Sequence, residues 1–83
     1  MNEQQLDEIA ARCERAAPGP WLSYVEGRDH ESGSNFICTA GLNGEDLELS
    51  GASVADQDFI AHARQDLPAL IAEVRRLRRL LGQ

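Results

Sequence analysis

The chain has 83 residues, two cysteines, no lysine and a formal net charge of −6. A chain of this length forms one small domain with a thin core, because it buries only about 60–65% of its unfolded surface. The acidic excess argues against a general nucleic-acid binder, and two cysteines are too few for a disulfide scaffold. No apolar run is long enough to cross a membrane and no signal-peptide pattern is present, so we expect a cytoplasmic protein.

The first segment has the apolar spacing of an amphipathic helix, from residue 3 to residue 16. Leu6, Ile9 and Cys13 recur at intervals of three and four residues, which places them on one helix face. Asn2 precedes the segment and is a suitable N-cap. The two prolines and the glycine within residues 17–20 cannot continue a helix and predict its end.

Three short strands are predicted in the middle of the chain, at residues 21–26, 35–40 and 45–50, because apolar and polar side chains alternate there. A polar loop separates the first two, and the Asn43-Gly44 pair favours a tight reversal before the third. We expect a three-stranded antiparallel meander. Trp21 opens the first strand, where we expect it to anchor the sheet against the helices, with its indole N–H donating to a carbonyl group. Stacking on a ligand is the alternative.

Two helices are predicted after the sheet, at residues 54–65 and 67–81. Ser53 suits the N-cap of the first helix, and Gly82 is a plausible terminator of the second. Pro68 disfavours helical dihedral angles at Leu67, so we expect a proline corner there, with Asp66 as the N-cap of the second helix. The predicted fold class is therefore α+β, with an N-terminal helix, a meander and two C-terminal helices.

The last helix carries the strongest signal for a partner, because its apolar residues alternate at spacings of three and four. These residues are Leu67, Leu70, Val74, Leu77 and Leu81. The stripe either docks on the sheet as core or packs against a second copy. We expect a homodimer with Leu70, Val74, Leu77 and Leu81 in the interface, since association enlarges a thin core. Antiparallel packing would set the arginine-rich end of each helix near the partner's Asp58 and Asp66.

The charge is uneven along the chain. Residues 1–66 carry 13 acidic side chains against 4 arginines, whereas residues 67–83 carry 4 arginines against one glutamate. We expect the arginines of the last helix to meet acidic groups of this chain or of a partner, since the rest of the chain repels phosphate.

No residue pattern predicts a metal site, a cofactor or a catalytic centre. The thiols and imidazoles are those of Cys13, His30, Cys38 and His62, and their spacing matches no zinc motif. A small thiol in an apolar segment is usually a packing group. We therefore expect no enzymatic activity.

Two end segments resemble a family of small proteins from actinobacteria and their phages. The sequence AARCERAAPGPW, at residues 10–21, is similar to the opening motif of that family. The sequence DQDFIAHARQDLPALIAEVRRLR, at residues 56–78, is similar to its closing motif, which also recurs in Ead-like phage early proteins. The motifs cover a little under half of the chain and carry no assigned chemistry, so no catalytic residue is transferred. The resemblance implies a phage- or prophage-type accessory protein.

The leading hypothesis is a non-enzymatic accessory protein that self-associates and contacts a host protein. Two alternatives stay open. One is a counter-defence protein that binds a nucleotide signal, with Trp21 and Tyr24 for stacking and Arg28, Arg64 or Arg75 for phosphate. The other is an acidic inhibitor that mimics nucleic acid with the carboxylates of Glu45, Asp46, Glu48, Asp56 and Asp58.

Overall fold

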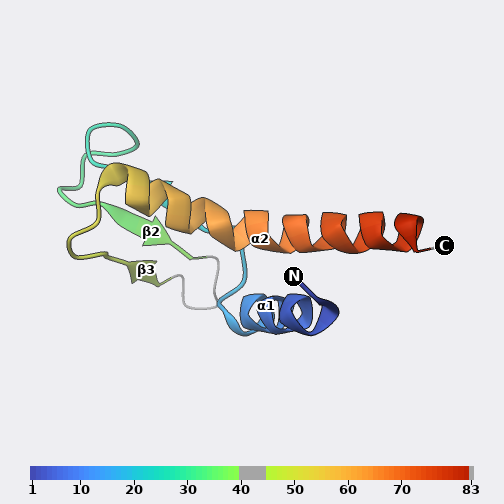
Figure 1. Ribbon diagram of the computed structural model, residues 1–83. Helices are drawn as coiled ribbons and strands as arrows, with labels where there is room; N and C mark the ends of the chain where they lie inside the picture. Colours follow the sequence, from blue (N-terminus) through green and yellow to red (C-terminus); the bar gives the residue numbers. More distant parts are fainter. Residues whose placement is uncertain (40–44, 83) are drawn as a thin grey trace.

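A computed structural model describes residues 1–39 and 45–82, which form two helices and a three-stranded antiparallel sheet (Figure 1). The elements in chain order are α1 (Glu3–Arg15), β1 (Leu22–Tyr24), β2 (Phe36–Cys38), β3 (Asp46–Leu47) and α2 (Val54–Leu81). The predicted α+β class is confirmed. The Asn43-Gly44 reversal and Ala40, the last residue of the second predicted strand, lie outside the described residues.

The N-terminal helix follows its sequence signals closely. Asn2 Oδ1 accepts from the backbone N–H of Gln5, and Gln5 Oε1 accepts from the N–H of Asn2, both at 2.8 Å. This reciprocal capping box satisfies two of the donors that a helix start leaves unpaired. Trp21 Nε1 donates to the carbonyl oxygen of Ala17 at 3.2 Å, as expected for its indole.

The sheet has the predicted meander order β1-β2-β3, with Ser23 opposite Ile37 and Ile37 opposite Leu47. All three strands are shorter than predicted. At both ends of β1, side chains take the backbone N–H groups that would extend the ladder. Gln65 accepts from the N–H of Trp21 at 2.8 Å, and Asp29 accepts from that of Val25 at 2.8 Å. Each such bond ends the regular pairing of β1 at that residue.

The prediction of two C-terminal helices joined at a proline corner is wrong, because α2 is one helix of 28 residues with Pro68 inside it. An interior proline costs about 3 kcal/mol. A break would instead leave backbone groups unpaired at two new helix ends and divide the surface on which α1 packs. Arg64, Pro68 and Ile71 line one groove with α1, so this packing spans the proline. Ser53 and Gly82 do cap the two ends of α2, as expected.

The core is thin and lies along α2, where α1 and the sheet pack on that helix. Its buried apolar residues are Leu6, Val25, Ile37, Ala61 and Ile71, of which Ile37 and Ala61 have no exposed surface. The sheet packs on the N-terminal half of α2 and α1 on its middle, while the last turns of α2 extend beyond both (Figure 1). The molecule is therefore elongated, at 53 × 25 × 19 Å.

A buried glutamine joins α2 to the sheet. Gln57 Nε2 lies 2.9 Å from Ser23 Oγ, 3.1 Å from the Tyr24 carbonyl oxygen and 3.2 Å from that of Phe36. A buried amide needs such partners because leaving it unpaired is costly. The side chain therefore sets the position of α2 over β1 and β2.

Candidate functional site

The exposed face of α2 carries a row of large apolar side chains, which we call the α2 stripe. Its members are Leu67, Leu70, Val74, Leu77 and Leu81. Leu70 is 59%, Leu77 44% and Leu81 86% exposed, whereas Val74 is half-buried. The structure thus places the four predicted interface residues on one face of one helix, and α1 and the sheet leave most of that face uncovered.

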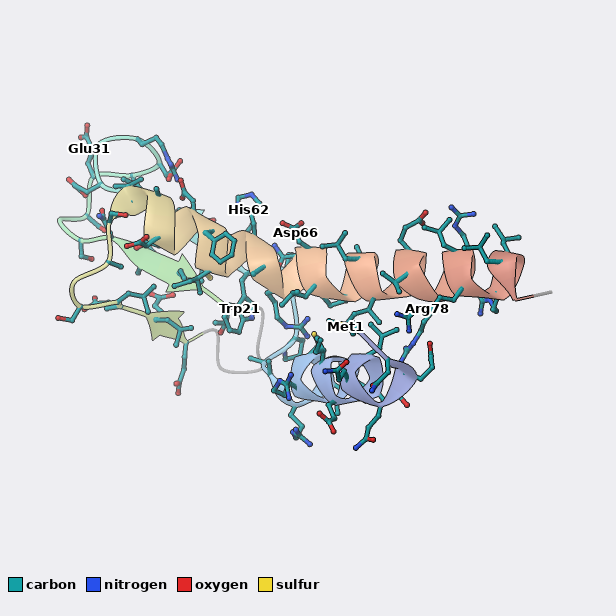
Figure 2. The ribbon with its side chains drawn as sticks, viewed as in Figure 1. Met1, Trp21, Glu31, His62, Asp66 and Arg78 are labelled. Carbon is teal, nitrogen blue, oxygen red and sulfur yellow. The ribbon has the colours of Figure 1, made fainter. Side chains whose placement is uncertain are left out.

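Two ion pairs join α1 to the flank of α2 that lies beside the α2 stripe. Arg75 donates to Asp7 at 2.9 Å, and Arg78 donates to Glu3 at 2.7 Å and to the carbonyl oxygen of Met1. Figure 2 shows Arg78 reaching from α2 toward Met1 at the start of α1. The expectation that these arginines meet acidic groups of their own chain is confirmed for Arg75 and Arg78, so Arg75 is not a free phosphate ligand.

A third arginine is paired within α2 itself. Arg76 donates to both carboxylate oxygens of Glu73, at 3.1 and 2.5 Å. This hydrogen bonding lowers the pKa of Glu73 below its ordinary value. Both side chains are about half exposed, so the pair lies at the surface, where it is easily exchanged for another.

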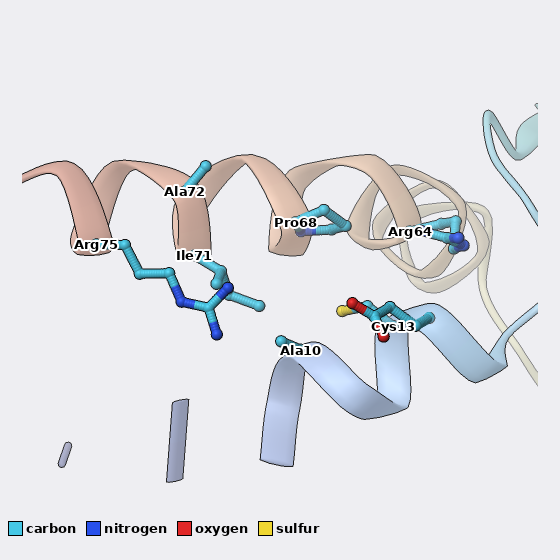
Figure 3. Close-up of a pocket in the computed structure, with 8 residues that line it drawn as sticks. Ala10, Cys13, Arg64, Pro68, Ile71, Ala72 and Arg75 are labelled. Carbon is cyan, nitrogen blue, oxygen red and sulfur yellow. The ribbon is translucent and has the colours of Figure 1, made fainter. Parts of the chain in front are cut away.

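A groove of about 260 Å³ runs between the two helices (Figure 3). It is lined by Ala10, Cys13, Glu14, Arg64, Pro68, Ile71, Ala72 and Arg75. The sulfur of Cys13 points into it (Figure 3), and Arg64 Nε donates to the carbonyl oxygen of Ala17 at 2.8 Å. Arg64 therefore braces the segment that follows α1.

A second, polar groove of about 450 Å³ lies beside β1. It brings together Trp21, Tyr24 and Arg28, three of the five predicted ligand contacts. Arg64 and Arg75 lie elsewhere, at the groove between α1 and α2. Asp58, His62 and Gln65 of α2 complete the wall.

The charge of Arg28 in this polar groove is already balanced. Its guanidinium donates to both oxygens of Asp58, at 2.9 and 3.0 Å, and to Asp29 at 2.9 Å. Hydrogen bonds from Arg28 and then from Ser23 lower the pKa of Asp58 to about 2. Arg28 likewise lowers the pKa of Asp29, together with the backbone N–H of Val25. A phosphate would have to compete with two carboxylates for this arginine.

The sequence predicts Asp58 to contact the arginines of a partner helix or to form part of an acidic mimic, and no local signal marks its observed partner, Arg28. Arg28 lies thirty residues earlier in a polar loop. Of the other carboxylates proposed to mimic nucleic acid, Asp56 accepts from the N–H of Ser53 at 3.1 Å as part of the α2 cap. Asp56 and Asp58 thus have structural partners, while Glu45, Asp46 and Glu48 are exposed.

His30 is half-buried rather than part of an open loop. Its ring lies against those of Tyr24 and Phe36, with centroids 6.2 and 5.0 Å away. Nδ1 accepts from the backbone N–H of Ser32 at 3.0 Å, and buried Nε2 has no hydrogen-bond partner among the described residues. The imidazole packs the loop against the sheet.

Residues 1–39 and 45–82 contain no group of three side chains placed to hold a metal ion. In the same residues both cysteines are free thiols, each half-buried. No helix of the described chain combines the length and the apolar character needed to span a membrane.

Comparison with protein families, with curated proteins and with solved structures finds no match to this chain.

Proposed function

We propose that the chain is a non-enzymatic interaction protein that self-associates through the α2 stripe. The observation that carries this proposal is the exposure of Leu70, Leu77 and Leu81 on a helix that extends past the rest of the fold. Apolar area in water is unfavourable by roughly 25 cal/mol per Å², and contiguous exposed apolar surface is typical of contact sites. A second copy offers the same stripe, so one symmetric contact covers both.

The biological setting rests on the resemblance of the two end motifs to actinobacterial, actinophage and Ead-like phage proteins. On that basis we propose a phage- or prophage-type accessory protein that acts in the cytoplasm and contacts a host protein. Leu22 and Phe59, 48% and 75% exposed, lie on β1 and the first half of α2, apart from the α2 stripe. They offer apolar surface for such a partner.

Binding of a small molecule is the second candidate, because the polar groove gathers Trp21 and Tyr24 beside Arg28. It ranks below self-association for an electrostatic reason. Asp29 and Asp58 hold the guanidinium, so a nucleotide phosphate meets a groove without excess positive charge. An acidic mimic of nucleic acid ranks third, since Asp56 and Asp58 are engaged in the fold.

Sedimentation velocity across a range of concentrations tests the leading proposal. We expect the wild-type chain to dimerise and Leu77→Glu to be monomeric, because the variant places a charge in the centre of the apolar contact. Arg79→Glu, two residues further along and on the opposite face of the helix, is the matched control and keeps the dimer. A wild-type monomer at all concentrations, or a Leu77→Glu dimer, would contradict self-association through this stripe.

A thermal-shift screen with nucleotides tests the second candidate separately, since a ligand that binds the native state raises its melting temperature. A shift that disappears in Trp21→Ala would support the groove as a ligand site.

A further inference from the structure

The continuity of α2 gives its apolar face a heptad repeat that a proline corner would have interrupted. Counting from Ile60, the first position of each heptad (a) holds Ile60, Leu67, Val74 and Leu81, and the fourth (d) holds Ala63, Leu70 and Leu77. We call these seven residues the heptad seam. They extend the α2 stripe by one heptad toward the N-terminus, and such a repeat is the pattern by which two helices wrap around each other.

The charges beside the heptad seam differ on its two sides. Of the four positions before an a residue (g), the central two hold the acids Asp66 and Glu73 and the outer two hold Phe59 and Leu80. Of the three positions after a d residue (e), the first and last hold the bases Arg64 and Arg78. Between these two arginines, Ile71 is buried. Charges at e and g determine which partner a helix accepts and in which direction.

We propose that the second copy lies parallel to the first along the heptad seam, an inference that rests on the self-association proposed above. In a parallel pair, each g side chain faces the partner's e side chain of the next heptad. Glu73 then faces the partner's Arg78, and symmetry repeats the contact. In an antiparallel pair, g faces g and e faces e, so acids oppose acids and arginines oppose arginines. Charge complementarity therefore selects the parallel pair and reverses the orientation expected from the sequence.

The apolar side chains bear on the number of strands rather than on their direction. Two of the four a positions hold the β-branched Ile60 and Val74, and two of the three d positions hold Leu70 and Leu77. In parallel coiled coils, β-branched residues at a with leucine at d favour two strands.

Glu73 and Arg78 can meet a partner without disrupting the fold. Glu73 is bonded only to Arg76 of its own helix among the described residues, and a surface pair of this kind contributes little. Arg78 uses Nη1 and Nη2 toward α1, and its guanidinium carries five N–H donors. A carboxylate from the partner would join the Arg78–Glu3 pair rather than replace it.

The position of α1 leaves room for the second helix. It packs on the flank of α2 that carries Ile71 and Arg75 and leaves Leu70, Leu77 and Leu81 exposed. Ile9 and Cys13 of α1 also line an apolar groove of about 230 Å³ with Ile60, Ala63 and Leu67. The partner helix would cover the heptad seam and the edge of this groove together.

Cysteine cross-linking tests the orientation. In a Cys13→Ser/Cys38→Ser background, Leu81→Cys places a thiol at the last a position. In a parallel dimer the two thiols are adjacent, and diamide should convert most of the chain to a disulfide dimer on a non-reducing gel. In an antiparallel dimer they lie at opposite ends of a seam about 30 Å long. Arg79→Cys in the same background, directed away from the seam, is the matched control and should stay uncrosslinked.

The outcomes separate the two proposals. A dimer by sedimentation in which Leu81→Cys cross-links no better than Arg79→Cys overturns the parallel orientation and leaves self-association standing. A chain that is monomeric by sedimentation overturns both.

Reversing the charge of Glu73 is a second, independent test of the orientation. Glu73→Arg faces the partner's Arg78 in a parallel dimer and should raise the dimer Kd about three- to tenfold. The same variant would face Asp66 in an antiparallel dimer and lower the Kd. Glu8→Arg, on the exposed surface of α1, changes the net charge equally and should leave the Kd within about twofold. An unchanged or lower Kd for Glu73→Arg overturns the parallel pair.

Discussion

Arg28 and Asp58 join the loop after β1 to the first turns of α2 through two parallel hydrogen bonds of 2.9 and 3.0 Å. Ser23 Oγ donates to the same carboxylate at 2.7 Å. Three segments of the chain thus converge on one acid. The stability that these contacts contribute depends on pH, because they need the ionised carboxylate of Asp58.

Asp58→Asn should lower the melting temperature at pH 7, because the amide cannot replace the charge-assisted bonds from Arg28. The pKa of Asp58 is about 2 in the fold, below its ordinary value of 3.8. Its contribution is therefore present above about pH 4 and is lost as the pH falls toward 2. Thermal unfolding followed by circular dichroism should show the two proteins converging over that interval. Asp46→Asn on β3 is the control, and a gap that is constant with pH would contradict the assignment.

Gln57→Leu should destabilise the fold by about 1–3 kcal/mol, because it removes the buried donor that the carbonyl oxygens of Tyr24 and Phe36 share. Urea unfolding measures the change. Gln4→Leu, on the exposed surface of α1, makes the same substitution where no buried acceptor depends on it. Equal effects of the two variants would refute the role of Gln57.

Pro68→Ala should stabilise the protein by about 1–3 kcal/mol, because alanine restores an N–H inside a continuous helix and removes a steric conflict. The gain is partly offset where the smaller side chain loses contact with α1. Pro18→Ala lies outside the helices and is the control. A free energy of unfolding that is unchanged or lower in Pro68→Ala would contradict a strained proline inside a continuous helix.

The pair between Arg78 and Glu3 should contribute less than about 1 kcal/mol, because both side chains are substantially exposed. A double-mutant cycle with Arg78→Gln and Glu3→Gln measures the coupling, which should shrink in 1 M salt. A cycle between Glu3 and Arg28 is the control, since their partners on α2 are twenty residues apart. Coupling that is insensitive to salt would point to packing rather than charge.

Self-association predicts a melting temperature that rises with protein concentration, since the partner binds only the folded state. Differential scanning calorimetry over a hundredfold range of concentration should show the rise for the wild type. Leu77→Glu should melt at one temperature throughout. A wild-type midpoint that does not move would count against a dimer coupled to folding.

Much of the helical structure could be predicted from the sequence, because its determinants lie within a few residues of one another. Asn2 and Gln5 cap α1 across three residues, and Ser53 and Asp56 cap α2 in the same way. Pro68 shows where local rules fail. Its preference for a helix start was outweighed by the packing of α1 on both sides of it.

The sheet was predictable in order but not in extent. The residues that end the pairing of β1 are Gln65, on a helix more than forty residues later, and Asp29, in the following loop. The alternation of apolar and polar side chains in residues 21–26 does not predict those acceptors. The pairing of Arg28 with Asp58 was equally invisible, because a charge does not specify its partner at a distance.

The sequence by itself determined the apolar repeat from Leu67 to Leu81, the helix caps and the uneven charge, all of which arise from spacing along the chain. Only the tertiary structure decided that α2 runs unbroken past the sheet and that its leucines stay uncovered. Spacing places side chains on a common face, but which faces meet depends on the packing of elements distant in sequence.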